Sequence, residues 1–299
     1  MISFLSSYQS LADQILIYSV LAMSQCLVMR AGLFSLAPTA FAGIGAYTMA
    51  VLTTAHGVNP VLAIVCGVML ATLVAAAMAL ATSRLRGVFQ AVATLALVQV
   101  MVTVGLGWES VTRGALGING IPKVATTGWL LLVVALATWL LWTIGRYSIG
   151  RAFDLIREDE TVAVSLGISV MRYHRFAMIL SGLLGGLAGA LYAANSHAIQ
   201  PSEFGFSMIV AGLTMAVLGG HKSVWGALLG AAILISLPEL FRVFAEYRSV
   251  FQGVLLMLVI IFLPNGIVDS LLELAHERKV RRALPSGDGG NIDTKARAT

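Results

Sequence analysis

The chain has 299 residues, of which 58% are hydrophobic and only 11% are charged, and its mean hydropathy is +0.89. Soluble domains average about 25% charged residues, so a compact soluble enzyme of this length would lack the charges to cover its surface. The composition therefore excludes a soluble globular fold and a disordered chain, and it favours a protein embedded in a lipid bilayer. The net charge is +5, and the placement of the charges is more informative than their sum.

Long charge-free stretches predict membrane-spanning helices over residues 1–268. A helix needs about 20 apolar residues to cross about 30 Å of hydrocarbon. We therefore expect an all-α, polytopic integral membrane protein with about nine transmembrane helices and a short cytoplasmic helix. The predicted spans lie near 11–29, 32–55, 60–82, 88–107, 128–145, 176–195, 206–220, 224–241 and 250–268. Pro38 predicts a kink or break in the second span, and the seventh is short enough to be tilted or re-entrant.

Polar and small residues inside the spans suggest two further features. Ser35, Thr39, Gln90, Thr94 and Gln99 are candidates for lining a path for a polar solute, although interhelical hydrogen bonding is the simpler explanation for any one of them. Gly182, Gly185, Gly186 and Gly189 recur at the four-residue spacing that lets two helix backbones approach closely. We interpret these glycines as helix-packing positions, with a substrate site as the alternative.

Residues 146–174 form a long connection that has helical signals of its own. Asp159 is a plausible N-cap and Gly167 a plausible stop, which predicts a short helix near 160–166. Val162, Ala163 and Leu166 would form a small apolar knob on it, next to the charged run Arg157, Glu158, Asp159 and Glu160. This segment is either an ordinary amphipathic surface turn or a docking site for a soluble cytoplasmic partner.

Basic residues predict which ends of the spans face the cytoplasm. Fifteen of the 19 basic residues follow odd-numbered spans, and the other face receives only Arg113, Lys123, Arg242 and Arg248. By the positive-inside rule, the N-terminus lies outside and the C-terminus in the cytoplasm. The tail 269–299 would then be cytoplasmic and partly disordered, and its basic cluster either anchors the topology or touches anionic membrane lipid.

From the sequence we predict no catalytic, cofactor-binding or metal site. The five histidines do not pair at metal-ligand spacing, the chain has no phosphate-binding loop motif, and its two cysteines rule out a disulfide framework. The spans also lack the buried carboxylate or lysine expected of a proton-coupled carrier. A driving force supplied by another subunit is the expectation, and an ion-coupled carrier is disfavoured.

At the 146–174 loop the chain resembles the permeases of branched-chain amino-acid ABC importers. The resemblance rests on Gly150-Arg151-Ala152, Ile156-Arg157-Glu158-Asp159-Glu160 and Leu166-Gly167-Ile168. It is supported by Gly32–Leu36, Ala40–Tyr47, Gly117–Pro122, Leu187–Tyr192 and Leu218–Gly226 in that order. One departure is Ala37-Pro38, where the family usually has Gly-His.

The resemblance implies a place in the bacterial inner membrane and a set of partners. These are a second permease subunit, two cytoplasmic ABC ATPases that bind the ATP, and an extracytoplasmic substrate-binding protein, with no nucleic acid. Residues 158–167 would be the coupling helix that inserts into the ATPase, with Arg157, Glu158, Asp159 and Glu160 contacting it by charge. The expected solutes are leucine, isoleucine and valine. Alternatives are an ABC permease for urea, amides or sugars, and a channel or structural subunit of a membrane complex.

Overall fold

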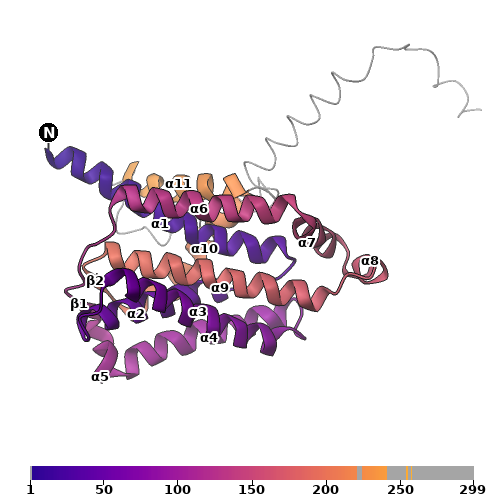
Figure 1. The fold of residues 1–299 in the computed structure, drawn as a ribbon, viewed down its shortest axis with the longest axis horizontal. Helices are drawn as coiled ribbons and strands as arrows, with labels where there is room; N and C mark the ends of the chain where they lie inside the picture. Colours follow the sequence, from indigo (N-terminus) through magenta and orange to yellow (C-terminus); the bar gives the residue numbers. More distant parts are fainter. Residues whose placement is uncertain (1, 221–223, 241–253, 255–256, 258–299) are drawn as a thin grey trace, which may run out of the picture.

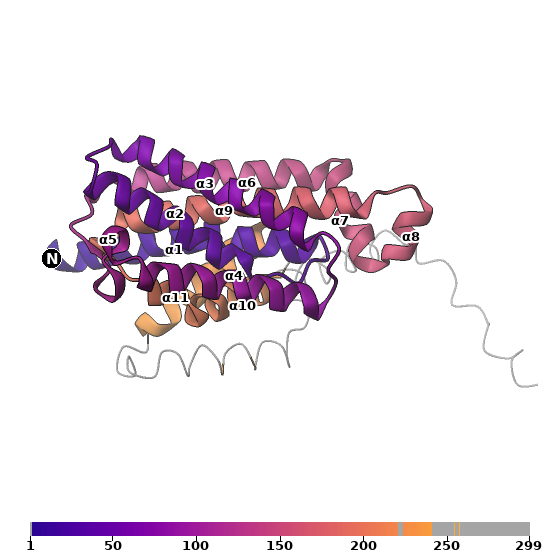
Figure 2. The same cartoon turned by 90° about the horizontal axis from the view of Figure 1, so that it is seen from below.

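Long helices run side by side along one axis of the molecule (Figures 1 and 2). The computed structural model describes residues 2–220, 224–240, 254 and 257. The long helices are α1 (Ile2–Arg30), α2 (Ala37–Thr54), α3 (Pro60–Thr82), α4 (Val88–Gly107), α6 (Thr127–Arg146), α9 (Val170–Asn195), α10 (Phe206–Gly219) and α11 (Val224–Leu240). Short elements connect them: α5 (Glu109–Thr112), η1 (Gly114–Leu116), β1 (Ile118–Asn119), α7 (Ser148–Glu158), α8 (Glu160–Ser165), β2 (Ala198–Ile199) and η2 (Pro201–Phe204).

Eight of the nine predicted spans have a helix over them in the described part of the chain. Five helices are long and apolar enough to cross a membrane, namely α1 from Gln9 onward, α3, α4, α6 and α9. The 14 residues of α10 reach only about 21 Å, so this helix is short for a bilayer as the sequence indicated. The predicted ninth span, apart from Val254 and Met257, and the tail 269–299 lie outside the described residues.

The second span begins at Ala37 instead of residue 32, because the chain breaks between α1 and α2. Residues 33–36 have no helical structure although Leu33 and Ser35 are buried. Gln25 donates to the Ser35 carbonyl at 2.9 Å, which supplies a partner for one exposed backbone group of the break. Pro38 lies in the first turn of α2, where a missing N–H costs nothing. The predicted break near Pro38 is confirmed, and it precedes the proline.

Small residues on α9 set how closely α2 and α3 approach it. A Cβ on Gly182 or Gly186 would collide with the side chains of Ala75 and Ala71 on α3. On the neighbouring edge of α9, a Cβ on Gly185 or Gly189 would collide with backbone of α2, at Pro38 and Ala42 respectively. The four glycines thus serve two interfaces, with one pair facing each helix, and backbone approach of this kind is how membrane helices pack tightly.

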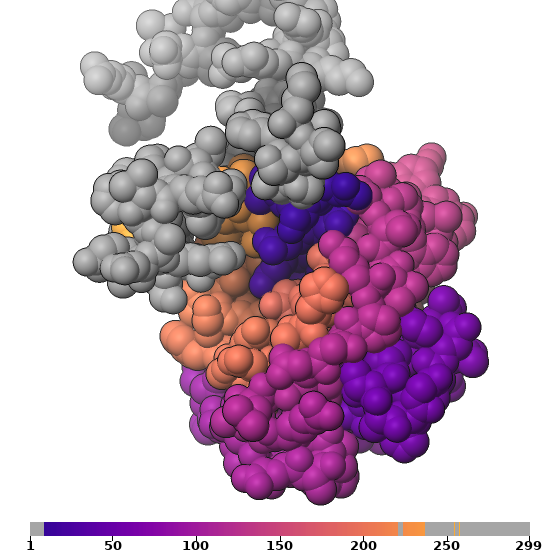
Figure 3. Space-filling view, turned by 90° about the vertical axis from the view of Figure 1, so that its left-hand side faces the viewer, coloured from indigo at the N-terminus to yellow at the C-terminus, as the bar shows by residue number. Residues whose placement is uncertain are grey.

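The short elements gather at the two opposite ends of the bundle. The N-terminus, α5, β1 and β2 lie at one end, whereas α7 and α8 lie at the other (Figures 1 and 2). β1 and β2 pair antiparallel, with Ile118 opposite Ile199, so they tie the loop before α6 to the loop after α9. In Figure 3, which views this end, the orange and magenta segments border the visible indigo part of α1. Sequence reasoning missed this strand pair, because two residues are too few to show a strand pattern.

Candidate coupling and pathway sites

The predicted short helix of the connecting loop is present as α8, at the end of the bundle that also holds α7 (Figure 1). The Asp159 carboxylate caps it, accepting from the backbone N–H of Thr161 at 2.8 Å and of Val162 at 3.2 Å. The Thr161 side-chain hydroxyl donates to the same carboxylate, and these bonds together lower the pKa of Asp159 below its ordinary value. Gly167, at φ +79°, ends the helix in the left-handed conformation that glycine adopts readily. Both predicted ends are confirmed.

A second helix, α7, precedes α8 and was not predicted from the sequence. Its buried face consists of Gly150, Ala152, Phe153 and Ile156. The Phe153 ring packs edge-on against the Tyr173 ring of α9, with 6.1 Å between the ring centroids. The apolar spacing of these residues was visible, but the charged run after Ile156 obscured the helix. Arg157 and Glu158 complete α7, so only Asp159 separates the two helices.

Two ion pairs and one backbone contact attach α7 and α8 to the bundle. Arg30, the last residue of α1, donates through Nε and Nη2 to both oxygens of Asp154, at 2.8 and 2.9 Å. Arg86, from the loop before α4, lies 2.8 Å from Glu160. Arg157 packs on the turn before α2, with its Cα 3.3 Å from where a Cβ on Gly32 would lie. The loop therefore rests on the connections that lead into α2 and α4.

The exposed apolar surface of α8 differs from the expected knob. Val162 and Leu166 are exposed as predicted, and Val164 is exposed beside them. Ala163 is fully buried, packed with Ile156 and Val170 in a small separate core, so its prediction as a surface residue is wrong. A short helix that lies on a support must bury one of its faces, and Ala163 is on that face. Val164 takes its place in the exposed set, which we call the α8 surface: Val162, Val164 and Leu166.

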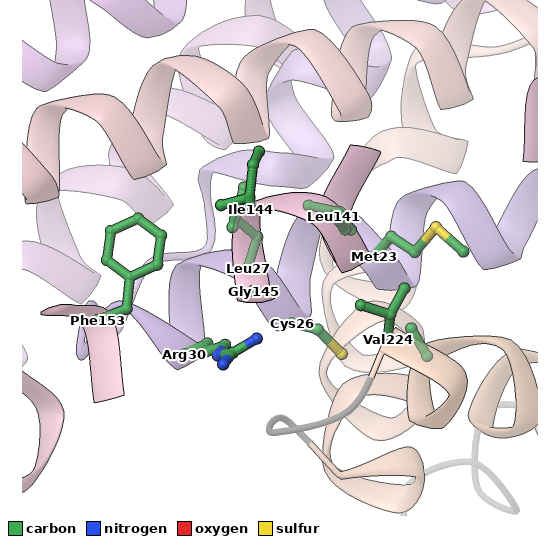
Figure 4. Close-up of a pocket in the computed structure, with 10 residues that line it drawn as sticks. Met23, Cys26, Leu27, Arg30, Leu141, Ile144, Gly145, Phe153 and Val224 are labelled. Carbon is green, nitrogen blue, oxygen red and sulfur yellow. The ribbon is translucent and has the colours of Figure 1, made fainter. Parts of the chain in front are cut away.

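A narrow seam between α1, α6, α7 and α11 lies next to the α7–α8 loop (Figure 4). Its lining is apolar except for the Arg30 guanidinium, and its volume is about 20 Å³. That is about the room one water needs, so the seam is closed to a solute.

Four of the five predicted pathway residues lie buried near the start of α2. They are Ser35 on the connection into α2, Thr39 in α2 itself, and Gln90 and Thr94 on α4. Thr94 accepts a hydrogen bond from the Leu36 N–H at 3.0 Å and donates to carbonyls of its own helix, and the Ser35 hydroxyl accepts from the Ala37 N–H. These contacts join α2 to α4 and supply hydrogen-bond partners for backbone groups at the break before α2. Gln99, by contrast, is exposed on α4 and lies apart from the other four.

Within the described residues, no group of three or more histidine, cysteine or acidic side chains could hold a metal ion. What the structure brings together is a supported surface helix, a polar contact between α2 and α4, and a bundle of apolar helices.

Comparison with known proteins shows the family to which the chain belongs. The family described as "Branched-chain amino acid transport system / permease component" matches residues 7–261. The LivM permease proteins of the high-affinity branched-chain amino acid transport systems of Escherichia coli K12 and Salmonella typhimurium are 29% and 30% identical, over 86% of this chain and 69% of each relative. An autoinducer 2 import system permease protein, LsrC of Yersinia pestis (strain Pestoides F), is 27% identical over 62% of this chain and 57% of its own length. No solved structure matches the chain. The chain therefore belongs to the family of permease components of branched-chain amino acid transport systems, and it is a polytopic membrane protein.

Proposed function

We propose that this chain is a permease subunit of an ABC importer that moves leucine, isoleucine and valine across the bacterial inner membrane. Permease components of ABC importers work with other ABC subunits. For this chain we infer a second permease subunit, two cytoplasmic ATPases that bind the ATP, and an extracytoplasmic substrate-binding protein. The chain itself would catalyse no reaction and hold no cofactor. The similarity to the two LivM proteins favours the branched-chain solutes.

The α8 surface carries the inference about the ATPase. It presents three apolar side chains, Val162, Val164 and Leu166, next to the exposed charges of Arg157, Glu158 and Asp159. An apolar centre with a charged rim is the usual anatomy of a protein interface. α8 also stands at the tip of the loop, beyond the ends of the long helices (Figures 1 and 2), where a soluble subunit has access.

The basic residues support an orientation in which α8 is cytoplasmic. Arg30 and Arg86 pair with the loop, and Arg146, Arg151, Arg157, Arg172 and Arg175 belong to it or border it. At the opposite end, the connection that carries α5 and β1 has Arg113 and Lys123 as its only basic residues. The positive-inside rule then puts α8 in the cytoplasm and the N-terminus outside.

A charge placed on the α8 surface tests the proposal. We expect Leu166→Asp to abolish co-purification with the ATPase and ATP-driven uptake of radiolabelled leucine into proteoliposomes, because Leu166 is 66% exposed and the change disturbs no core. Leu116→Asp is the matched control for ATPase binding, since Leu116 is 79% exposed at the opposite end of the bundle, and it should still co-purify with the ATPase. Full ATPase binding by Leu166→Asp would refute the docking role. A wild-type complex that carries no branched-chain amino acid would refute the proposed substrate.

A further inference from the structure

A pocket of about 410 Å³ lies at the end of the bundle that holds α7 and α8 (Figure 1). This volume is within the range of small-molecule sites. Three segments form the wall, namely the first turn of α7, the turn between α8 and α9, and the first two turns of α9. The lining residues are Ile149, Gly167, Ile168, Ser169, Arg172, Tyr173 and Phe176. This described lining combines a guanidinium and two hydroxyl groups with apolar side chains, and none of its members is acidic.

The wall of this pocket is held in place by contacts of the protein itself. Ile168 and Tyr173 pack on the small core that contains Ala163. The Ile168 N–H donates to the Ala163 carbonyl at 3.0 Å, directly after Gly167 turns the chain at φ +79°. The pocket is therefore formed before a ligand arrives, and a ligand has little of the protein to order when it binds.

Arg172 is the charged group of this lining, and one side of its guanidinium is already held. Its Nε donates to the Ser169 hydroxyl at 2.8 Å. Among the described residues, no carboxylate lies within ion-pair distance of Arg172, because the ion pairs there are Arg30–Asp154 and Arg86–Glu160. The two Nη groups are thus available, and a planar fork of this kind matches two oxygens of a phosphate group.

The pocket lies at the level where the apolar helices end. Phe176, in its wall, begins the predicted sixth span and is 40% exposed. α6 ends at Arg146, directly before α7, and the Arg146 guanidinium lies over the exposed Trp142 ring, 5.1 Å from the ring centroid. A tryptophan beside an arginine at the end of an apolar helix is typical of the membrane interface. Arg172 is then at the level of the lipid headgroups, with Phe176 at the edge of the hydrocarbon.

We propose that this pocket binds the headgroup of an anionic phospholipid of the cytoplasmic leaflet, with the phosphate on Arg172 and the start of an acyl chain along Phe176. Basic pockets at the cytoplasmic ends of membrane helices suit such headgroups. The leaflet rests on the orientation in the proposed function, whereas the ligand chemistry does not. An acidic segment of the ATPase is the competing occupant, but it would make no use of the apolar wall at Phe176. The bound lipid would join α7 to α9, the two helices that support α8.

Lipid titration of the full chain, purified in an uncharged detergent, tests this proposal. Phosphatidylglycerol should raise the unfolding midpoint at lower concentrations than phosphatidylcholine with the same acyl chains. Arg172→Gln should raise the half-saturating phosphatidylglycerol concentration about 10-fold, which corresponds to about 1.4 kcal/mol. That is near the lower end for hydrogen bonds to charged groups, because Arg172 is exposed. Arg151→Gln is the matched control and should titrate like the wild type, since Arg151 is also exposed but does not line the pocket.

Three results would overturn the proposal. The first is a phosphatidylglycerol titration that Arg172→Gln leaves unchanged or alters no more than Arg151→Gln does, which would mean that the lipid acts elsewhere or through net charge alone. The second is an equal, Arg172-dependent rise in midpoint with millimolar inorganic phosphate, which would identify a free anion as the ligand. The third is a loss of ATPase co-purification in Arg172→Gln with an unchanged lipid titration, which would place the ATPase in the pocket.

The lipid site and the proposed function can fail separately. If leucine is transported and Leu166→Asp abolishes that transport while the lipid titration fails, the proposed function stands and only this site is wrong.

Discussion

Replacing Gly189 by alanine should separate α2 from α9. A Cβ at this position would lie far inside 3.0 Å of the Ala42 carbonyl oxygen, a distance that real Cβ contacts essentially never show. The obstacle is backbone, so no side chain can rotate away, and α2 must shift. Overpacking of this kind typically costs about 1–3 kcal/mol. The intrinsic gain of alanine over glycine inside a helix, about 1 kcal/mol, works in the opposite direction.

Gly212→Ala provides the control that cancels this gain. Gly212 is also a buried helical glycine, in α10, but a Cβ there would meet no atom of the described residues within 4 Å. The two variants should therefore differ by about 1–3 kcal/mol, or about 2–12 °C in the unfolding midpoint if the scale for domains of 150–250 residues applies. The measurement is the temperature at which the purified protein loses its monodisperse peak in detergent. Equal midpoints for Gly189→Ala and Gly212→Ala would refute the packing argument.

Two more expectations concern charged groups at opposite ends of the bundle. Double-mutant cycles in detergent should give a larger coupling energy for the Arg30–Asp154 pair than for the Arg86–Glu160 pair. The side chains of Arg30 and Asp154 are 17% and 47% exposed and are joined by two hydrogen bonds, whereas those of Arg86 and Glu160 are 76% and 31% exposed. We expect about 1.5–3 kcal/mol for the former and at most about 1 kcal/mol for the latter, and the reverse order would contradict the geometry. Burial raises the pKa of Glu203, so its ionised form destabilises the fold, and stability should increase as pH falls through the raised pKa. In the wild-type protein, the unfolding midpoint should therefore rise between pH 7.5 and pH 5, and Glu203→Gln should remove this rise. The same pH profile in both proteins would contradict the assignment to Glu203.

The length of the charge-free stretches predicted the membrane helices well, because the requirement that makes them helical acts within each stretch. Hydrocarbon tolerates no unpaired backbone, so an apolar stretch of sufficient length has to be helical. The bounds of α3 coincide with the prediction, as do those of α4. α2 starts five residues late because buried partners, among them Gln25 and Thr94, satisfy the backbone of the break. Those partners are distant in sequence and leave no local signal.

The candidate sites were less predictable because they depend on tertiary contacts. The cap and stop of α8 are encoded within ten residues, at Asp159 and Gly167, and both were found. Which face of α8 is buried depends on α7 and α9, and the pattern alone misplaced Ala163. Tyr47 carried no signal, since a tyrosine in an apolar span is usual. Only the packed structure shows that its hydroxyl is buried and has no hydrogen-bond partner among the described residues.

The attachments of the α7–α8 loop suggest how a movement there would reach α2 and α4. Arg157 packs on Gly32, which precedes the start of α2 by five residues, and Glu160 pairs with Arg86, which precedes the start of α4 by two. α2 and α4 also pack against each other where a Cβ on Gly43 would fall on the Met101 side chain. A displacement of α8 by a docked ATPase would thus act on the near ends of both helices, and rigid helices transmit it along their length. The surface ion pair is too weak to drive such a change, so we expect the packed backbone contact at Gly32 to transmit it.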